Sequence, residues 1–308
     1  MPDMRTRILG KMTNMEVEEY LKRSDVIFIP VGTIETHGTF PLDIETTVPE
    51  GIALEMAEKT DGLVLGGLPY FFCGATTIAR GTVQMSVKDG VQYLEKIAHS
   101  LLNQGFRRQI YLSLHGPAFL TAGTVVIDFF DETKVPITYL ALEMAAQVAS
   151  AKGVFVDMNA LCYGAYKKLN KLDELVVDPN AEENSRVVDL GHMPSGVEME
   201  KMISSMASSS VAAKYQYFFG KYAHPSGAVG FYFDEPSTHG GSLGALRSIE
   251  ERDRRGEEGL KAVADFVDAL DMPEYVRKMR ELDEWTQSFI MPKYGKYLPR
   301  NKFPDPNC

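Results

Sequence analysis

The chain lacks the features that would place it in a membrane or in an oxidising compartment. No apolar run in its 308 residues approaches the roughly 20 residues that a membrane span needs. The N-terminal MPDMRTRILGKM has no long apolar stretch and no small-residue cleavage site, so we expect no signal peptide. The three cysteines, Cys73, Cys162 and Cys308, are far apart without CxxC spacing, which favours reduced thiols over a disulfide framework or a zinc cluster. We therefore expect a cytoplasmic protein.

Positive charge is also scarce. The sequence has 32 Lys and Arg against 42 Asp and Glu, which gives a formal net charge of −10. A nucleic-acid or anionic-membrane binder needs a basic surface, so neither class of partner is expected. The hydrophobic share of 44% and the charged share of 24% are ordinary for a soluble globular protein. The length suits one large domain or two smaller ones.

Strand and helix signals alternate over the first two-thirds of the chain. Short apolar runs predict strands at Asp25–Val31, Leu63–Leu65, Gln109–Leu114, Pro136–Leu142 and Gly153–Asp157. Apolar residues at helical spacing predict helices near 48–59, over 86–104 with Ser86 as N-cap, and near 260–270. Such alternation predicts an α/β fold with a mostly parallel sheet that is covered on both faces. In such sheets, ligands bind beyond the carboxyl ends of the strands.

The stretch from 282 to 308 differs from the rest of the chain. It is rich in proline, lysine and aromatic residues and has no clean hydrophobic period. We predict a single α/β domain over residues 1–281 and an extended tail over residues 282–308. This tail is expected to pack on the body of the protein or on a neighbouring subunit.

The segment after the first predicted strand carries four potential metal ligands within eleven residues. Glu35 and His37 are two residues apart, and Asp43 and Glu45 repeat this spacing. On an extended segment, residues i and i+2 point the same way, so a carboxylate and an imidazole would converge on one point. Carboxylate oxygen together with imidazole nitrogen suits zinc, manganese or iron. The same spacing also fits solvated loop charges and a His37 that hydrogen-bonds to the backbone.

Two later segments contain further candidate residues. His115 follows the predicted strand Gln109–Leu114 and precedes a Gly-Pro turn, so it is either a site residue or a satisfied histidine at the sheet rim. His192 and Glu198 are six residues apart across a Pro/Gly turn, which lets both reach one cavity. A loop that leads into a capped helix explains this last pair as well.

Other reactive residues have weaker patterns. Cys73 is a possible nucleophile, although a packing role is commoner for such a cysteine. His99 falls on the polar side of the helix 86–104, beside Glu95, and is expected to be solvated. The sequence contains no GxSxG motif, no glycine-rich phosphate loop with a lysine and no HExxH motif.

Taken together and in this order, the three segments resemble the creatininase (creatinine amidohydrolase) family. The resemblance covers about residues 20–200 in a consistent order. The segments that are similar to family motifs are Ile29–Gly38, Pro69-Tyr70, Gly81-Thr82, Ser113–Ala118 and His192–Glu198.

The resemblance implies a three-layer α/β/α sandwich with a mostly parallel sheet, assembly into trimers or hexamers, and a site for one or two divalent metal ions. Glu45 falls on the bridging aspartate of the family after a one-residue deletion, and Asp43 is its rival for that position. His192 and Glu198 match catalytic residues, and His192 matches the histidine that shuttles a proton to the leaving nitrogen. The residues that match metal ligands are Glu35, His37, Glu45, His115 and Glu198.

Several departures from the family pattern bear on the substrate. Glu45 is longer by one methylene than the aspartate that it replaces. Pro117 stands where creatininase itself supplies a glutamate to the second metal. The tryptophans specific for creatine have no counterpart, because the single tryptophan of the chain is Trp285. We therefore do not expect creatinine itself as the substrate.

These observations favour a metal-dependent hydrolase that acts on a small polar cyclic amide, formamide or cyclic ketone. Metal-activated water would attack the carbonyl carbon, and His192 would protonate the leaving group. One alternative is a hydrolase or lyase that opens an inositol-derived cyclic polyol diketone. A second is a one-metal hydrolase or lyase in which Glu45 has lost the bridging role. Another is a non-catalytic relative that binds a small ligand, and the metal content of the protein separates it from the enzymes.

Overall fold

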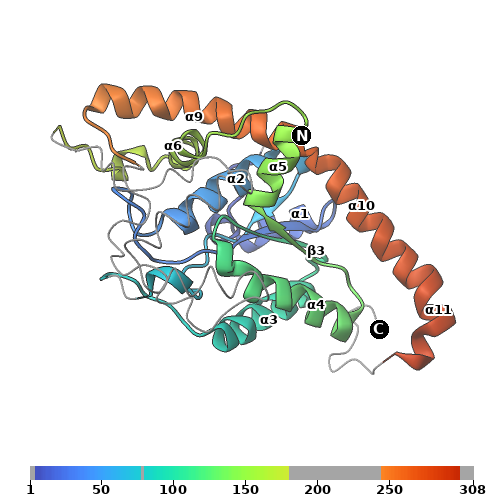
Figure 1. Cartoon of the computed structure of the whole chain (residues 1–308). Helices are drawn as coiled ribbons and strands as arrows, with labels where there is room; N and C mark the ends of the chain where they lie inside the picture. The colour runs from blue at the N-terminus through green and yellow to red at the C-terminus, as the bar shows by residue number, and fades with distance from the viewer. Residues whose placement is uncertain (1–3, 78–79, 180–243, 299–308) are drawn as a thin grey trace.

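The computed structural model describes residues 4–77, 80–179 and 244–298 of the chain (Figure 1). Within these residues, four parallel strands form one sheet in the order β2-β1-β3-β4. The strands are β1 (Val26–Pro30), β2 (Leu63–Val64), β3 (Arg108–Ser113) and β4 (Thr138–Ala141). The helices are α1 (Asn14–Leu21), α2 (Ile44–Thr60), α3 (Val87–Asn103), α4 (Ala122–Thr133), α5 (Leu142–Ala151), α6 (Met158–Lys168), α9 (Ile249–Leu270), α10 (Met272–Trp285) and α11 (Met291–Tyr294). None of the described helices is both long enough and apolar enough to cross a membrane.

The sheet buries side chains on both of its faces, because successive strand residues point in opposite directions. Val26 and Phe28 of β1 belong to one hydrophobic core, together with residues of α2, α6 and α9. Ile27 and Ile29 belong to a second core, which α1, α3 and α4 complete. The molecule is therefore the three-layer α/β/α sandwich with a parallel sheet that the sequence predicts (Figure 1).

Small residues let α2 and α9 approach α6 closely. A Cβ added at Gly164 of α6 would lie 2.1 Å from the carbonyl oxygen of Gly259 in α9. A Cβ added at Gly51 of α2 would lie 2.6 Å from the Cα of Ala165 in α6. Neither position accommodates a side chain without displacing a helix. This packing fixes α2, which begins near the carboxyl ends of the strands and carries Glu45, against the helical layer.

Most of the predicted elements are confirmed with small shifts in their bounds, although the helix predicted near 260–270 begins already at Ile249. The predicted N-cap of the helix 86–104 is also confirmed, because the side chain of Ser86 accepts a hydrogen bond from the backbone N–H of Asp89. The predicted strand Gly153–Asp157 is wrong, since this segment is irregular chain between α5 and α6. The side chain of Phe155 is 83% exposed there, whereas a strand inside a covered parallel sheet is buried on both faces.

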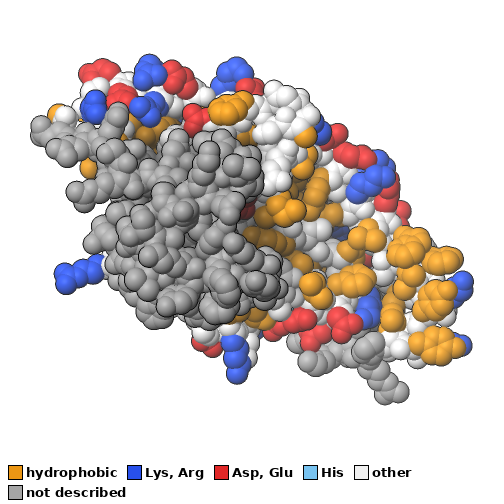
Figure 2. All heavy atoms as spheres, viewed as in Figure 1, with side chains coloured by type: hydrophobic (Ala, Val, Ile, Leu, Met, Phe, Trp, Pro, Cys, Tyr) orange, Lys and Arg blue, Asp and Glu red, His pale blue; other side chains and the backbone are white. Residues whose placement is uncertain are grey.

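The prediction of an extended chain after residue 282 is also wrong for the described part of that segment. After α10, the chain continues through a π-helical turn (Thr286–Ile290), α11 and a 3-10 turn (Gly295–Tyr297). We call residues 272–297 the C-terminal arm, which runs along one side of the molecule (Figure 1). Figure 2 shows hydrophobic side chains gathered on this arm, and Trp285, Phe289 and Tyr297 are exposed. These exposed aromatic side chains hide the helical period in the sequence.

Candidate metal centre

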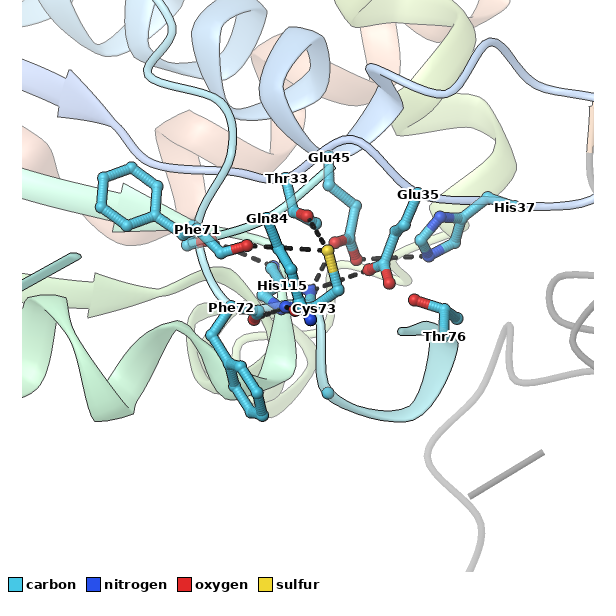
Figure 3. A network of polar contacts seen from close by, with 12 residues as sticks. Thr33, Glu35, His37, Glu45, Phe71, Phe72, Cys73, Thr76, Gln84 and His115 are labelled. Carbon is cyan, nitrogen blue, oxygen red and sulfur yellow. Dashed lines mark hydrogen bonds and ion pairs between the residues drawn. The ribbon is translucent and has the colours of Figure 1, made fainter. Parts of the chain in front are cut away.

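Four titratable side chains meet beyond the carboxyl ends of β1 and β3 (Figure 3). Glu35 and His37 lie on the segment that follows β1, and Glu45 lies in the first turn of α2. His115 comes two residues after the end of β3. One ligand atom from each of Glu35, His37 and Glu45 lies within 4.8 Å of the others. The strand-end rule therefore brings together the residues that the sequence singled out.

A glycine holds the start of α2 against the end of β1. A Cβ added at Gly32 would lie 2.2 Å from the backbone oxygen of Glu45. Any larger residue at this position would push the first turn of α2 away from the site. The intervening loop is closed by a hydrogen bond of 2.9 Å from the backbone N–H of Glu35 to the carbonyl oxygen of Leu42. Glu45 thus reaches the same point as Glu35 although it lies ten residues later.

The imidazole of His115 contacts both carboxylates. Its Nδ1 lies 3.1 Å from Oε1 of Glu35 and also contacts Oε2 of Glu45. The other oxygen of Glu45, Oε1, lies 3.3 Å from Nε2 of His37. Glu35 is 2% exposed, Glu45 is 6% exposed and His115 is 3% exposed. Charges buried to this extent are destabilising unless every group has a partner of opposite charge.

The opposite side of the His115 ring fixes its tautomer. Nε2 lies 2.8 Å from the carbonyl oxygen of Phe72, which only accepts hydrogen bonds, so Nε2 carries a hydrogen. In the neutral ring, Nδ1 then presents a lone pair to two carboxylates. A proton on Nδ1 or a cation between these groups relieves the repulsion. Metal-bound histidines usually donate their second ring N–H to such a carbonyl or to a carboxylate.

Burial and mutual charge shift the pKa values of the cluster in opposite directions. Burial, and after it the Glu45 carboxylate, raise the pKa of Glu35 to about 8. Burial opposes the charged form of His115, but the carboxylates of Glu45 and Glu35 outweigh it and raise the histidine pKa well above its usual value. The same balance raises the pKa of His37. Burial likewise opposes the charged form of Glu45, but His115 and His37 hold the pKa of this carboxyl well below its usual range.

Two buried oxygen atoms at the cluster have neither a hydrogen bond nor an ion pair among the described residues, whereas the similarly buried Oε2 of Glu45 contacts His115. The two atoms are Oε2 of Glu35 and Oγ1 of Thr76. Thr76 is 1% exposed, and Figure 3 shows its hydroxyl pointing toward the Glu35 carboxylate. Carboxylate oxygens and imidazole nitrogens are the donors that zinc, manganese and iron accept. The donor set and its unsatisfied oxygen therefore fit a divalent cation.

Asp43 does not join the cluster. Its Oδ1 accepts a hydrogen bond of 3.1 Å from the hydroxyl of Tyr166, and its Oδ2 accepts one of 2.9 Å from Thr47. The structure therefore places Glu45, rather than Asp43, beside Glu35 and His115. The repeated spacing in the sequence offered both carboxylates equally, because it does not specify where α2 begins.

Cys73 lies buried beside the cluster (Figure 3). Its Sγ contacts the hydroxyl of Thr33, and its backbone N–H donates a hydrogen bond of 2.6 Å to Oε1 of Gln84. Burial raises the pKa of the Cys73 thiol to about 12, although the hydrogen bond with Thr33 opposes this shift. A thiol that stays protonated is a poor nucleophile. The structure thus favours the packing interpretation of Cys73.

The remaining histidines differ from expectation or fall outside the described residues. The expectation of a solvated His99 is wrong, because this side chain is 9% exposed. Its Nε2 lies 3.1 Å from Glu132, since α4 covers this side of α3. His192 and Glu198 lie outside the described residues, and their roles stay predictions.

The sequence prediction missed Glu143, the second residue of α5. This half-buried carboxyl lies just beyond the end of β4, on the strand next to β3. Burial raises the pKa of Glu143 to about 7, and the Glu45 carboxylate adds to the shift. The available signal was a glutamate directly after a predicted strand. A single carboxylate without a partner at informative spacing did not stand out.

Comparison with known proteins points to one family. Residues 10–230 match the sequence model of the family described as Creatininase, creatinine amidohydrolase. A curated protein of Thermotoga maritima, 3-dehydro-scyllo-inosose hydrolase, is 35% identical over 115 residues. This match covers 35% of the chain and 36% of the relative, so it spans about a third of the length of that protein.

Solved structures share the fold at low sequence identity. A Bacteroides fragilis protein provisionally named as a creatinine amidohydrolase is 20% identical, with a TM-score of 0.56 over 92% of this chain and 98% of that one. A creatininase structure with manganese is 18% identical, with a TM-score of 0.50 over 85% of this chain and 97% of that one. At these identities the likeness concerns the fold.

Proposed function

Because the chain belongs to the creatininase family, we propose that it is a metal-dependent hydrolase that opens the ring of a small polar carbonyl compound. The observation that carries this proposal is the buried cluster of Glu35, His37, Glu45 and His115 beyond the ends of β1 and β3. These are residues that the resemblance to the family matches to metal ligands. Their burial, their mixed carboxylate and imidazole chemistry and the fixed tautomer of His115 all support a cation site.

The cluster would hold one or two divalent ions, namely zinc, manganese or iron, with Glu198 as a further ligand. A divalent ion held there would lower the pKa of a coordinated water and polarise a substrate carbonyl. The chain supplies the orientation of the ligands. The carbonyl of Phe72 fixes the ring of His115, and the lack of a side chain at Gly32 keeps Glu45 in reach.

The proposed reaction adds one water across a ring bond. The water oxygen bonds to the ring carbonyl carbon, and the bond from this carbon to its ring neighbour breaks. The neighbour, a nitrogen or a carbon, takes the electron pair and a proton. His192 donates this proton as the general acid, and Glu198 accepts the proton that the water loses. The product is an open-chain carboxylic acid, and no oxidant or reductant is consumed.

A cyclic ketone derived from a polyol is the favoured substrate. The Thermotoga maritima relative is named for hydrolysis of such a compound, 3-dehydro-scyllo-inosose. The single tryptophan, Trp285, lies in the C-terminal arm, so the described site has no counterpart of the creatine-specific tryptophans. A small cyclic amide or formamide is the second candidate, supported by the family description.

The test combines elemental analysis of the purified protein with a ring-opening assay followed by NMR. The assay uses an inositol-derived cyclic diketone and creatinine as separate substrates. We expect about one to two zinc, manganese or iron ions per chain and faster opening of the diketone. A protein that holds no metal even after reconstitution would contradict the proposal and favour the non-catalytic, ligand-binding interpretation.

Two histidine variants form a matched pair for this test. His115 and His99 are both buried and both lie 3.1 Å from a glutamate oxygen, but only His115 belongs to the cluster. We expect His115→Asn to lose metal and activity. We expect His99→Asn to keep both, with at most a modest loss of stability.

We also propose that the protein is a cytoplasmic homo-oligomer, a trimer or a hexamer as in the family that it resembles. Its partners are small-molecule substrates, with no nucleic acid or membrane involved. Sedimentation velocity at several protein concentrations tests the assembly. A single monomeric species at every concentration would contradict it.

A further inference from the structure

A third strand brings a carboxylate to the edge of the sheet where the cluster lies. β3 and β4 are neighbouring parallel strands, and their register pairs Ser113 with Ala141. His115 and Glu143 each come two residues after this pair. The backbone of His115 and of Ala141 is extended, so the segments that follow β3 and β4 leave the sheet in the direction of their strands. Glu143 therefore emerges at the same edge as the His115 imidazole.

The electrostatic surroundings of Glu143 agree with this placement. Burial raises its pKa, and its own backbone N–H opposes the shift. The next contributions come from Glu45, which raises the pKa, and from His115, which lowers it. The pKa of Tyr139 on β4 is raised by burial and then by the carboxylates of Glu143 and Glu45. Glu143 thus shares one neighbourhood with the cluster.

Within the described part of the chain, the groups that offset the charge of the Glu143 carboxylate are its own backbone N–H and the His115 imidazole. No lysine or arginine of this part forms an ion pair with Glu143, and the side chain is only partly covered. A partly buried carboxylate without a lysine or arginine partner is stabilised by further hydrogen-bond donors. A bound molecule with donor groups can reach it, because it stays accessible at the edge where ligands of such sheets bind.

We propose that Glu143 contacts the substrate and accepts hydrogen bonds from hydroxyl groups on its ring. This inference rests on the proposed function and narrows its substrate class. An ionised carboxylate only accepts hydrogen bonds, and a neutral polyol presents O–H donors around its ring. A substrate that carries its own carboxylate would meet like charge at Glu143. Glu143 therefore selects a neutral polyhydroxylated ring over an acidic one.

The test measures binding without turnover. The probe is myo-inositol, a cyclic polyol that has no carbonyl group to hydrolyse, titrated by NMR into the metal-reconstituted protein. We compare the unchanged protein, Glu143→Gln and the control Glu174→Gln, which alters an exposed glutamate in the 3-10 turn after α6. Glu143→Gln is expected to weaken binding roughly tenfold or more, the value of one hydrogen bond to a charged group. The control is expected to bind like the unchanged protein.

Two further readouts separate substrate contact from other roles. Metal content and Tm are expected to stay the same in Glu143→Gln. With the cyclic diketone, its KM is expected to rise more than its kcat falls. Equal affinity for myo-inositol in Glu143→Gln and the unchanged protein would overturn the inference, and so would loss of metal from the variant. If myo-inositol binding depends on Glu143 while no ring is opened, the proposed function fails and this inference stands.

Discussion

His115 is held between a backbone carbonyl on one side of its ring and two glutamates on the other. Its Nδ1 is satisfied either by a proton or by a cation. Bulk water has little access, because Glu35 and His115 are each no more than 3% exposed. Protons and a metal ion bound at this cluster would therefore compete for the same buried groups, and pH would control that competition.

The metal-free protein is expected to lose stability as pH rises from about 4.5 to about 8. Glu35, with a pKa of about 8 in the fold against 4.5 ordinarily, keeps a proton that the unfolded chain has already lost. Raising the pH through this window removes that proton and disfavours the folded state. The raised pKa values of His37 and His115 act in the same direction above their ordinary value of 6.5. Thermal unfolding of chelator-treated protein across the range measures the effect.

Two buried glutamates provide a test variant and a matched control for this prediction. Glu35→Gln is expected to flatten the decline of Tm with pH. Glu55→Gln, which alters a glutamate paired with Lys168 at 2.6 Å, is expected to leave the slope unchanged. A Tm that increases over the same pH window would show that the cluster holds no extra proton.

Thr76 offers a second prediction at this scale. Its hydroxyl is buried and has no hydrogen-bond partner among the described residues. Thr76→Val is therefore expected to leave the free energy of unfolding within about 1 kcal/mol. Activity is expected to fall roughly tenfold, the value of one hydrogen bond, because the hydroxyl points toward Glu35, where water or a substrate oxygen would bind (Figure 3).

Steady-state kinetics and urea unfolding measure the two quantities. Thr124→Val, which alters an exposed threonine of α4, serves as the control and is expected to keep full activity. Full activity in Thr76→Val would remove Thr76 from the site.

Part of the candidate site follows from the sequence by a single rule. Glu35, His37 and His115 come after buried strands, so the carboxyl-end rule places them together. The choice between Asp43 and Glu45 does not follow, because it depends on where α2 begins, which the spacing does not specify. Glu143 was missed for a related reason, since its proximity comes from the pairing of β3 with β4.

At the scale of elements, the close crossing of α6 and α9 requires glycine at the point of contact. Gly164→Ala would place a Cβ 2.1 Å from the backbone oxygen of Gly259, so the helices must separate. We expect a net loss of about 2 kcal/mol in the free energy of unfolding, measured by urea denaturation. Gly10→Ala is the matched control, because nothing lies within 4 Å of its added Cβ. Equal stabilities of the two variants would mean that α6 and α9 do not cross as described.

Secondary-structure elements that are buried are predicted more accurately from the sequence than segments that are exposed. β1 and β3 lie inside the sheet, so their residues are almost all apolar and the runs are easy to recognise. The run Gly153–Asp157 has a similar composition but connects two helices. The sequence alone does not show whether a neighbouring strand is present to pair with it, and none of the described strands does. The prediction for the C-terminal arm is wrong because the arm is exposed rather than buried. Its exposed aromatic residues obscure the helical period.

For the whole molecule, a buried ionic contact fastens the C-terminal arm to the sheet. Asp283 of α10 is 6% exposed and accepts hydrogen bonds of 3.1 Å and 3.0 Å from Arg107. Arg107 directly precedes β3, and Arg108 lies 3.6 Å from the same carboxylate. Helix α10 is thus held at the amino-terminal end of β3, opposite the site.

Asp283→Asn is expected to destabilise the protein by about 3 kcal/mol, because it leaves the partly buried guanidinium group of Arg107 without its counter-charge. It is also expected to speed cleavage within the C-terminal arm during limited proteolysis. Asp265→Asn, which alters an exposed partner of Lys261 on α9, is the control and should change neither quantity appreciably. An Asp283→Asn protein as stable and as resistant as the control would show that the arm is held by other contacts.

The cluster draws its side chains from distant parts of the chain, since His115 lies 80 residues beyond Glu35 (115 − 35). An ion that binds both residues would act as a cross-link between β1 and β3. Closing a loop of this length has an entropic cost. In the folded protein, the parallel pairing of β1 and β3 has already closed this loop, so the ion does not have to compensate that cost. The unfolded chain has no such preformed site. Uptake of the ion during refolding would therefore report the moment at which β1 and β3 pair, and its release would mark their separation.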